Sequence, residues 1–222
     1  MAQSKIGVVL SGCGVNDGSE IHEAVATLLA ISRAGATAVC LAPDAPQSDT
    51  IDHLHRKPSG EARNMLIEAA RVCRGAIRDV ASIDPRELDA VILPGGFGAA
   101  KNLSTFAQDG ASCTVRPDVE QLLVEMHHAK KPIGAICIAP ALVARVFSSR
   151  GIPVEVTIGN DAEAAEQIRR MGARHSVRKT TEICVDEENR IVTTPAYMTA
   201  ETIAEVFEGI EKAVGKVLRM IP

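Results

Sequence analysis

Short apolar runs alternate along the chain with longer stretches whose apolar residues recur at helical spacing, which predicts β-strands separated by α-helices. The runs that predict strands cover residues 5–10, 37–41, 89–93, 132–137 and 154–158. The stretches that predict helices cover residues 19–33, 61–72, 117–129, a segment opened by Pro140, 162–171 and 202–218. Because the first strand, helix and second strand follow one another directly, they form a βαβ unit with parallel strands.

The first helix shows the pattern on which these predictions rest. Ser19 is its expected N-cap, since a serine hydroxyl can accept a backbone N–H of the first turn, and Gly35 ends it. Its apolar positions predict the face that is buried against the sheet. These positions are Ile21, Val25, Leu28 and Leu29.

Two segments depart from the alternation of strands and helices. Residues 43–60 are polar and contain three prolines and two histidines, which predicts a surface loop. Residues 182–185 and 191–194 predict the two strands of an antiparallel hairpin. The sequence contains no internal repeat or linker, so we expect one domain over residues 1–222.

Composition favours a sheet that is covered by helices on both faces. The apolar share is 46%, yet Trp is absent, Tyr occurs once and Phe four times, so the core must consist of Ala, Val, Ile and Leu. Aliphatic strands of this kind are typical of parallel sheets buried on both sides. We therefore expect an α/β fold, a flavodoxin-like three-layer α/β/α sandwich with a mostly parallel central sheet and a small antiparallel hairpin.

Charge and motif content exclude several function classes. The net charge of -4 and the shortage of aromatic residues argue against a nucleic-acid partner. The longest apolar stretch, residues 24–42, is interrupted by Arg33 and Gly35, so no membrane partner is expected. No signal-peptide pattern precedes the first strand, and six cysteines without a CxxC pair should be reduced thiols, so we expect a cytoplasmic protein. The histidines lack metal-ligand spacing with the cysteines, and we expect neither a metal nor a cofactor.

The run from Gly134 to Pro140 places Cys137 where an apolar strand meets a helix. Such a junction is typical of a nucleophile elbow, in which a strained turn exposes the side chain beside the N–H groups that open the next helix. A thiol in this position is expected to have a lowered pKa. The competing interpretation is a buried cysteine that packs as a small apolar side chain.

Two further features are predicted at the same edge of the sheet. Residues 94–98 follow another buried strand, where the amides of Gly95 and Gly96 can hold a developing oxyanion or simply form a turn. Glu20 and Glu23 open the first helix, so a carboxylate can reach the thiol. Glu23 adjoins the apolar face, where a carboxyl tends to stay protonated and can carry a proton, whereas Glu20 is expected to complement the helix dipole.

The loop of residues 12–14 has a weak similarity to the dinucleotide-binding fingerprint, with Asp44 as the acid that would bind the ribose. Asp17 would put a negative charge where the pyrophosphate lies, so a structural bend is favoured over a dinucleotide-dependent oxidoreductase. Cys13 faces the same edge as Cys137, which leaves a redox partnership conceivable. The possible pocket residues at this edge are Gly12, Cys13 and Glu20.

Four segments together resemble the ElbB proteins, a branch of the ThiJ/PfpI superfamily within the class I glutamine-amidotransferase-like fold. The segments are residues 11–23, residues 94–102, the turn around Cys137 and residues 192–198. The resemblance covers nearly the whole chain and implies one amidotransferase-like domain that forms a homodimer or a higher homo-oligomer. ElbB-type proteins are named for isoprenoid biosynthesis and described as glutathione-independent glyoxalases.

This resemblance implies a nucleophile at Cys137, an acidic partner at Glu23 and backbone amides from Gly96 and Ile138. The implied substrates are small 2-oxoaldehydes, methylglyoxal or glyoxal. Cys137 would attack the aldehyde to give a hemithioacetal, Glu23 would move a proton between the two carbons through an enediol, and water would release lactate or glycolate. No cofactor takes part in this scheme.

The chain departs from many members of the superfamily directly after the cysteine, where Ile138 replaces a histidine. Peptidase or glutaminase chemistry therefore lacks its obvious general base. The second hypothesis is a non-catalytic stress protein in which Cys137 senses oxidants or the pocket binds a metabolite. Both hypotheses predict a low pKa for the thiol.

Overall fold

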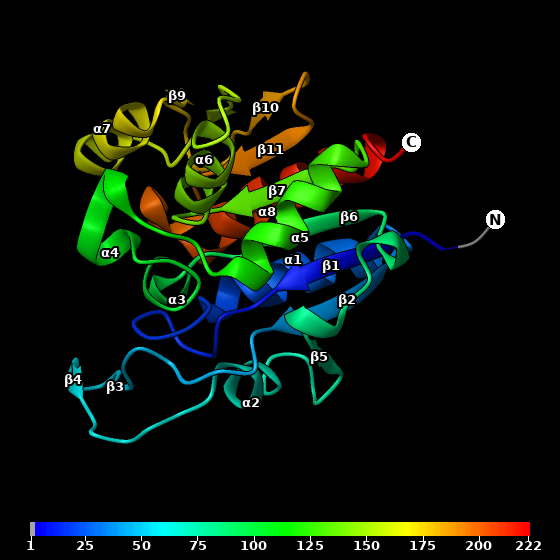
Figure 1. Ribbon diagram of the computed structural model, residues 1–222. Helices are drawn as coiled ribbons and strands as arrows, with labels where there is room; N and C mark the ends of the chain where they lie inside the picture. The colour runs from blue at the N-terminus through cyan, green and yellow to red at the C-terminus, as the bar shows by residue number, and fades with distance from the viewer. Residues whose placement is uncertain (1–2) are drawn as a thin grey trace.

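Seven strands form the central sheet of the computed structural model, which describes residues 3–222. Their order across the sheet is β10-β11-β7-β6-β1-β2-β5 (Figure 1). The strands are β1 (Lys5–Val9), β2 (Thr37–Ala42), β5 (Ile77–Asp79), β6 (Ala90–Leu93), β7 (Ile133–Ile136), β10 (Cys184–Asp186) and β11 (Ile191–Thr194). Within this sheet β10 is antiparallel to β11, and the other neighbouring pairs are parallel. The predicted mostly parallel sheet with an antiparallel hairpin is confirmed.

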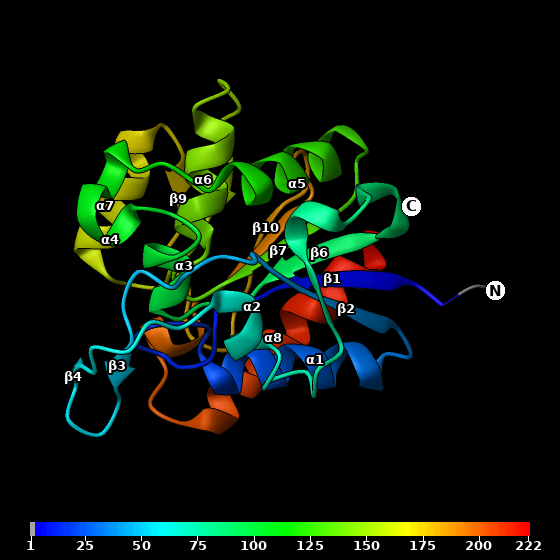
Figure 2. The same ribbon diagram turned by 60° about the horizontal axis from the view of Figure 1, so that its bottom comes forward.

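Helices cover both faces of the sheet, and Figure 2 shows α1 and α8 on one face with α5 and α6 on the other. The longer helices are α1 (Ile21–Arg33), α5 (Pro117–His128), α6 (Pro140–Ser148), α7 (Ala162–Met171) and α8 (Ile203–Arg219), and the short ones are α2 (Met65–Ala69), α3 (Phe97–Lys101) and α4 (Phe106–Asp109). Side chains alternate along a strand, so Ile92 packs with α1 and α8 while Val91 and Leu93 join a second cluster of buried apolar residues. The three-layer α/β/α sandwich is confirmed.

Helix α1 reverses the burial that its apolar pattern predicts. Ile21, Val25 and Leu29 are exposed by 43%, 46% and 38%. The buried face carries Glu23, Ala24, Ala26, Thr27, Ala30 and Ile31. Small side chains let α1 lie close to the sheet and to α8, so the predicted face is wrong at Ile21, Val25 and Leu29, whereas Leu28 packs against the core.

The start of α1 also differs from the prediction. The N-cap is Glu20, whose carboxylate accepts the Glu23 N–H at 2.8 Å. The Ser19 hydroxyl instead accepts the Ser11 N–H at 2.9 Å and ties the loop after β1 to the start of the helix. The expected Ser19 cap is therefore wrong by one residue.

The outer segments account for the remaining differences. The predicted strand at residues 154–158 is reduced to β8 (Glu155–Val156), which pairs with β9 (Arg174–His175) outside the main sheet. Strand β5 was not predicted, and α2 occupies only part of the predicted helix at residues 61–72. The polar loop contains a small hairpin made of β3 (Ile51–Asp52) and β4 (Lys57–Pro58). These segments are short, so their apolar periodicity carries little information.

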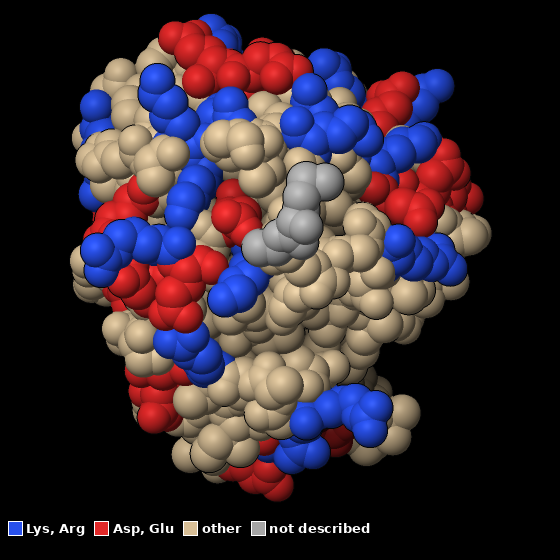
Figure 3. Space-filling model, turned by 90° about the vertical axis from the view of Figure 1, so that its right-hand side faces the viewer, with Lys and Arg blue, Asp and Glu red and all other residues tan. Residues whose placement is uncertain are grey.

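The surface shown in Figure 3 mixes both signs of charge, with Lys and Arg interspersed among Asp and Glu. This face offers no continuous basic surface for a phosphate backbone. Within residues 3–222, none of the helices combines the length and apolarity that crossing a membrane requires.

Candidate active site

Cys137 lies in the turn between β7 and α6, with a backbone φ of +62°. Residues other than glycine rarely adopt this region, and they do so mainly where the surrounding structure holds them. The Cys137 N–H donates to the Thr194 carbonyl at the end of β11 at 2.9 Å, which fixes the turn to the neighbouring strand. The strained strand-to-helix turn expected from the sequence is therefore present, but the expected exposure of its side chain is wrong, because Cys137 is buried.

Three groups act on the Cys137 thiol as hydrogen-bond partners: the backbone N–H groups of Gly96 and Ile138, and the Glu23 carboxyl. Gly96 belongs to the loop after β6, and Ile138 follows Cys137 toward the first turn of α6. Cys137 is only 7% exposed. The thiol thus lies in a buried site where hydrogen-bond donors and one carboxyl converge on it.

Glu23 brings this carboxyl to the sulfur from the buried face of α1 and is itself fully buried. The Gly95 N–H donates to Glu23 Oε2 at 2.9 Å, and the Tyr197 N–H donates to Oε1 at 3.3 Å. Both carboxyl oxygens are therefore held by backbone groups from two separate strand ends. This arrangement fixes the direction from which the carboxyl meets the thiol.

Burial dominates the electrostatics of this pair. Burial and the nearby Glu20 charge raise the pKa of Glu23 from 4.5 to about 8, against the hydrogen bonds from Cys137, Tyr197 and Gly95. Burial and the Glu23 charge also raise the pKa of the Cys137 thiol well above its usual value, against the N–H groups of Gly96 and Ile138. The expectation of a lowered thiol pKa is wrong, because these amides do not outweigh desolvation and the adjacent carboxyl.

The raised Glu23 pKa predicts a specific dependence of stability on pH. Between pH 4.5 and about 8 the folded protein keeps a proton that the unfolded chain releases, so this group lowers the free energy of unfolding as pH rises. The slope is at most about 1.4 kcal/mol per pH unit. We expect Glu23→Gln to raise the melting temperature relative to wild type at pH 8 more than at pH 5, as measured by thermal denaturation. An equal difference at both pH values would contradict the raised pKa.

Gly95 and Gly96 are glycines for steric reasons. A Cβ on Gly95 would collide with Cys137 Cβ and lie 2.7 Å from Glu23 Oε2. Gly96 has a φ of +95°, and a Cβ there would lie 2.5 Å from the Gly18 carbonyl oxygen. The Gly95 amide is occupied by Glu23, so of the two predicted oxyanion donors in this loop only Gly96 faces the sulfur.

We expect Gly95→Ala to separate the thiol from the carboxyl. The added methyl group should destabilise the protein by about 1–3 kcal/mol and lower any Cys137-dependent activity about 10²-fold, since displacements near 1 Å have effects of this size. Gly215→Ala, inside α8, is the matched control and should preserve both properties. Chemical denaturation measures the stability of both variants. Wild-type activity in Gly95→Ala would show that activity does not require the close approach of the Cys137 thiol and the Glu23 carboxyl.

The other predicted pocket residues have different positions. Glu20 is 8% exposed and lies beside Glu23, where it caps the helix. Gly12 faces the polar loop, because a Cβ there would lie 2.6 Å from Gln47 Oε1. Burial and the Glu68 charge raise the pKa of the Cys13 thiol. Neither Gly12 nor Cys13 joins the groups that contact the Cys137 sulfur.

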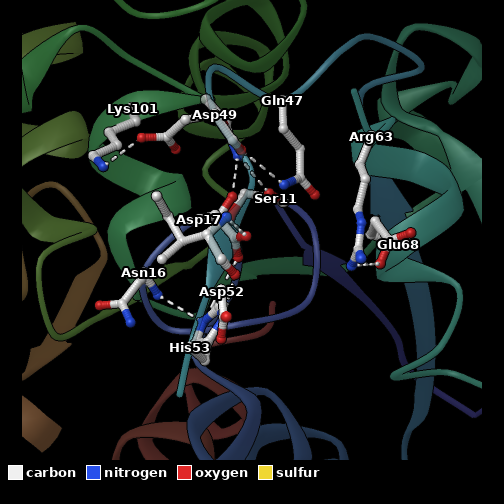
Figure 4. A network of polar contacts seen from close by, with 12 residues as sticks. Ser11, Asn16, Asp17, Gln47, Asp49, Asp52, His53, Arg63, Glu68 and Lys101 are labelled. Carbon is white, nitrogen blue, oxygen red and sulfur yellow. Dashed lines mark hydrogen bonds and ion pairs between the residues drawn. The ribbon is translucent and has the colours of Figure 1, made fainter. Parts of the chain in front are cut away.

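Figure 4 shows the polar network that fastens residues 43–60 to the loop after β1. Buried Asp17 accepts the Ile51 N–H at 2.7 Å through Oδ2. The His53 ring packs against the same loop, since a Cβ added to Gly14 would lie 2.5 Å from the His53 ring. Protein atoms and a carboxylate thus fill the place that a pyrophosphate would need, which counts against dinucleotide binding.

Tyr197 and His22 are site residues that the sequence reasoning missed. The Tyr197 N–H contacts Glu23, and its hydroxyl lies 2.7 Å from His22 Nδ1. Tyr197 follows the carboxyl end of β11. In α/β proteins ligands bind outside the carboxyl ends of the strands, so the position of Tyr197 along the chain could have indicated a site residue. The contact with His22 spans 175 residues and has no local signature.

Comparisons with known proteins place this geometry in a wider group, although no family model matches the sequence. The chain is 49% identical over 227 residues to glutamine amidotransferase-like class 1 domain-containing protein 3, mitochondrial, of Homo sapiens, covering 98% of this chain and 83% of that protein. It is 48% identical over 228 residues to the ES1 protein homolog, mitochondrial, of Rattus norvegicus, covering 98% and 84%.

Solved structures show the same fold. The isoprenoid biosynthesis protein with amidotransferase-like domain from Ehrlichia chaffeensis has a TM-score of 0.93 and 36% identity, covering 99% of this chain and all of that one. Glyoxalase III from Candida albicans has a TM-score of 0.65 over 99% and 98% of the two chains, and at 11% identity it shows the fold alone. The predicted resemblance to amidotransferase-like and ThiJ/PfpI proteins is confirmed.

The expectation of a cytoplasmic protein is wrong on these findings, because both relatives are named as mitochondrial proteins. The expectation rested on the opening residues and on the reduced cysteines. The fold, charge and cysteine content of a domain are compatible with either compartment, so they could not decide between them.

Proposed function

The chain belongs to the family of ES1 and glutamine amidotransferase-like class 1 domain-containing proteins, and from this premise we propose that it is a glutathione-independent glyoxalase. Its substrates are small 2-oxoaldehydes such as methylglyoxal and glyoxal, and its products are lactate and glycolate. One observation carries the proposal: the buried Glu23 carboxyl, with a pKa of about 8, touches the Cys137 sulfur. The fold shared with a protein named glyoxalase III adds support.

A carboxyl with this pKa suits a reaction that needs both an acid and a base. Near neutral pH its acid form dominates and its carboxylate form remains accessible, which is the condition for efficient proton transfer in both directions. The thiol is mostly neutral in the resting site, so it needs a base in contact with it. Glu23 in its carboxylate form is that base.

The first step forms the bond between sulfur and substrate. The Glu23 carboxylate takes the thiol proton while the Cys137 sulfur attacks the aldehyde carbon C1. The carbonyl electron pair moves to the oxygen, which takes the proton back from Glu23 and completes the hemithioacetal. The N–H groups of Gly96 and Ile138, which contact the sulfur at rest, are placed to stabilise the negative oxygen.

The second step moves hydrogen between the two carbons. The Glu23 carboxylate removes the C1 proton, and the electron pair forms an enediol with the neighbouring ketone carbon C2. This leaves a negative charge on the C2 oxygen. Return of the proton from Glu23 to C2, with transfer of the C1 hydroxyl proton to the C2 oxygen, gives a 2-hydroxy thioester on Cys137. Water then breaks the C–S bond, the sulfur recovers a proton, and lactate leaves. Carbon C1 is oxidised and C2 reduced, so no external electron acceptor is needed.

The same geometry counts against the competing functions. The hydrogen-bond partners of the Cys137 thiol are Glu23, Gly96 and Ile138, and none of these is the imidazole that peptidase or glutaminase chemistry uses. Oxidant sensing relies on a standing thiolate, whereas burial and the Glu23 charge raise the pKa of this thiol well above its usual value. The raised thiol pKa disfavours a standing thiolate, whereas the adjacent Glu23 carboxyl can take the thiol proton during the attack on a substrate.

A comparison of substrates tests the proposed step at C2. We expect the purified protein to form lactate from methylglyoxal and glycolate from glyoxal, and to form no propionate from propanal, which has no C2 carbonyl to accept the electron pair. Acid products are measured by chromatography in the absence of glutathione. Equal turnover of propanal would overturn the internal redox step, and no acid from any of the three would overturn the proposed function.

A further inference from the structure

Tyr197 contacts the first turn of α1 through both its backbone N–H and its side-chain hydroxyl. Its backbone N–H donates to Glu23 Oε1 at 3.3 Å, while its hydroxyl lies 2.7 Å from Nδ1 of His22, the residue before Glu23. The two aromatic rings are 5.8 Å apart and tilted by 45°. Tyr197 therefore bridges the turn that follows β11 and the beginning of α1.

The turn that carries Tyr197 needs to be held in place. Ala196 has a φ of +45°, a strained value for a residue with a side chain. The hydrogen bond from Tyr197 to Glu23 is already at the long end of the usual range, so a displacement of a few tenths of an ångström would remove it. The side-chain contact with His22 is the shorter of the two links to α1 and is suited to hold the turn.

The charges around the pair favour one direction for its hydrogen bond. The pKa of Tyr197 is raised by burial and by the charges of Glu20 and Glu23, so the phenol keeps its proton. The phenol can then donate to His22 Nδ1 when the imidazole is neutral. Glu20 Oε1 lies 4.0 Å from the same nitrogen, and His22 is half exposed to solvent. The titratable groups that face the pair are therefore Glu20 and Glu23.

We propose that Tyr197 and His22 are a positioning pair, whose side-chain hydrogen bond holds residues 195–198 against α1 and keeps the Tyr197 N–H on the Glu23 carboxyl. The inference deepens the proposed function, because it rests on the role given to Glu23. It assigns a task to a histidine that does not contact the sulfur: His22 acts on the chemistry through the placement of a backbone donor.

Alkylation of Cys137 by iodoacetamide tests the proposal without requiring any turnover. The rate is followed by mass spectrometry of the peptide that contains Cys137, at pH values that bracket the Glu23 pKa of about 8. Tyr197→Phe and His22→Leu both remove the side-chain bond. Since the Tyr197 N–H stabilises the charged carboxyl, its loss should raise the Glu23 pKa and move the first inflection of the profile upward by about half a pH unit.

Two further variants separate positioning from general destabilisation. His22→Asn keeps an acceptor near the place of Nδ1 for the Tyr197 hydroxyl and should restore the wild-type inflection. His128→Leu, on α5, removes an exposed histidine elsewhere and should leave the inflection unchanged. If Tyr197→Phe and His22→Leu keep the wild-type inflection, the proposal is overturned, whatever happens to their melting temperatures. A protein without glyoxalase activity would still give this readout, so the two proposals can fail separately.

Discussion

Replacing Cys137 with serine is expected to lower kcat/KM for methylglyoxal by about 10³-fold or more, because a hydroxyl is a far weaker nucleophile than a thiol that can ionise. The side chains have similar size, so the strained turn and its bond to Thr194 should survive. Steady-state lactate formation measures the loss. Thermal denaturation shows that the variant is folded.

The control for this prediction is Cys113→Ser. Cys113 is fully buried, and burial raises its pKa as it does that of Cys137, but its neighbours include Arg145 and Asp109 and no group of the site. We expect this variant to lose some stability and to keep kcat. Comparable loss of turnover in both serine variants would mean that the nucleophile has not been identified.

Replacing Glu23 with glutamine is expected to lower kcat by about 10²–10⁴-fold, the range that a positioned acid or base contributes. An amide can keep the contact with the Gly95 N–H, yet it can neither take the thiol proton nor carry the C1 proton to C2. The wild-type rate should rise with pH toward the Glu23 pKa of about 8, as the carboxylate becomes available, and this rise should disappear in the variant. Rates measured across this pH range test both parts.

The matched control is Glu68→Gln. Glu68 is also a buried glutamate, 6% exposed, but it is paired with Arg63 and Arg71 away from the sulfur. This variant should keep both kcat and the pH profile. If Glu23→Gln retains wild-type turnover, proton transfer by the carboxyl is excluded and the reaction needs another base.

Together the two variants separate stability from activity. The raised pKa of Glu23 makes its ionised form costly to the fold, so Glu23→Gln should be more stable than wild type at alkaline pH while it loses turnover. Cys137→Ser keeps Glu23, so we expect no such gain in stability at alkaline pH. A buried carboxyl that lowers stability is typical of a residue that is retained for function.

The sequence predicted the local parts of the site because each has a local signal. An apolar strand, a cysteine and a following Pro140 predict the turn, and two glycines after β6 predict close backbone approach. Since parallel strands end at one edge of the sheet, the βαβ unit also placed Glu23 beside Cys137. These inferences needed only residue type, spacing and strand direction.

The remaining features depend on packing between distant segments. The raised thiol pKa follows from burial by several elements together, and no local motif reports it. The outward face of α1 was misassigned because the helix packs through small residues, and the larger Val25 is left on the surface. The bond between His22 and Tyr197 joins residues that are far apart in sequence, so it became visible only in the folded structure.

Lactate formation from methylglyoxal by the purified protein, without glutathione or any added cofactor, tests the central claim most directly. The pairing of Cys137 with Glu23 predicts turnover in the wild type and in Glu68→Gln, and its loss in both Cys137→Ser and Glu23→Gln. A wild-type rate no higher than that of Cys137→Ser would contradict the account.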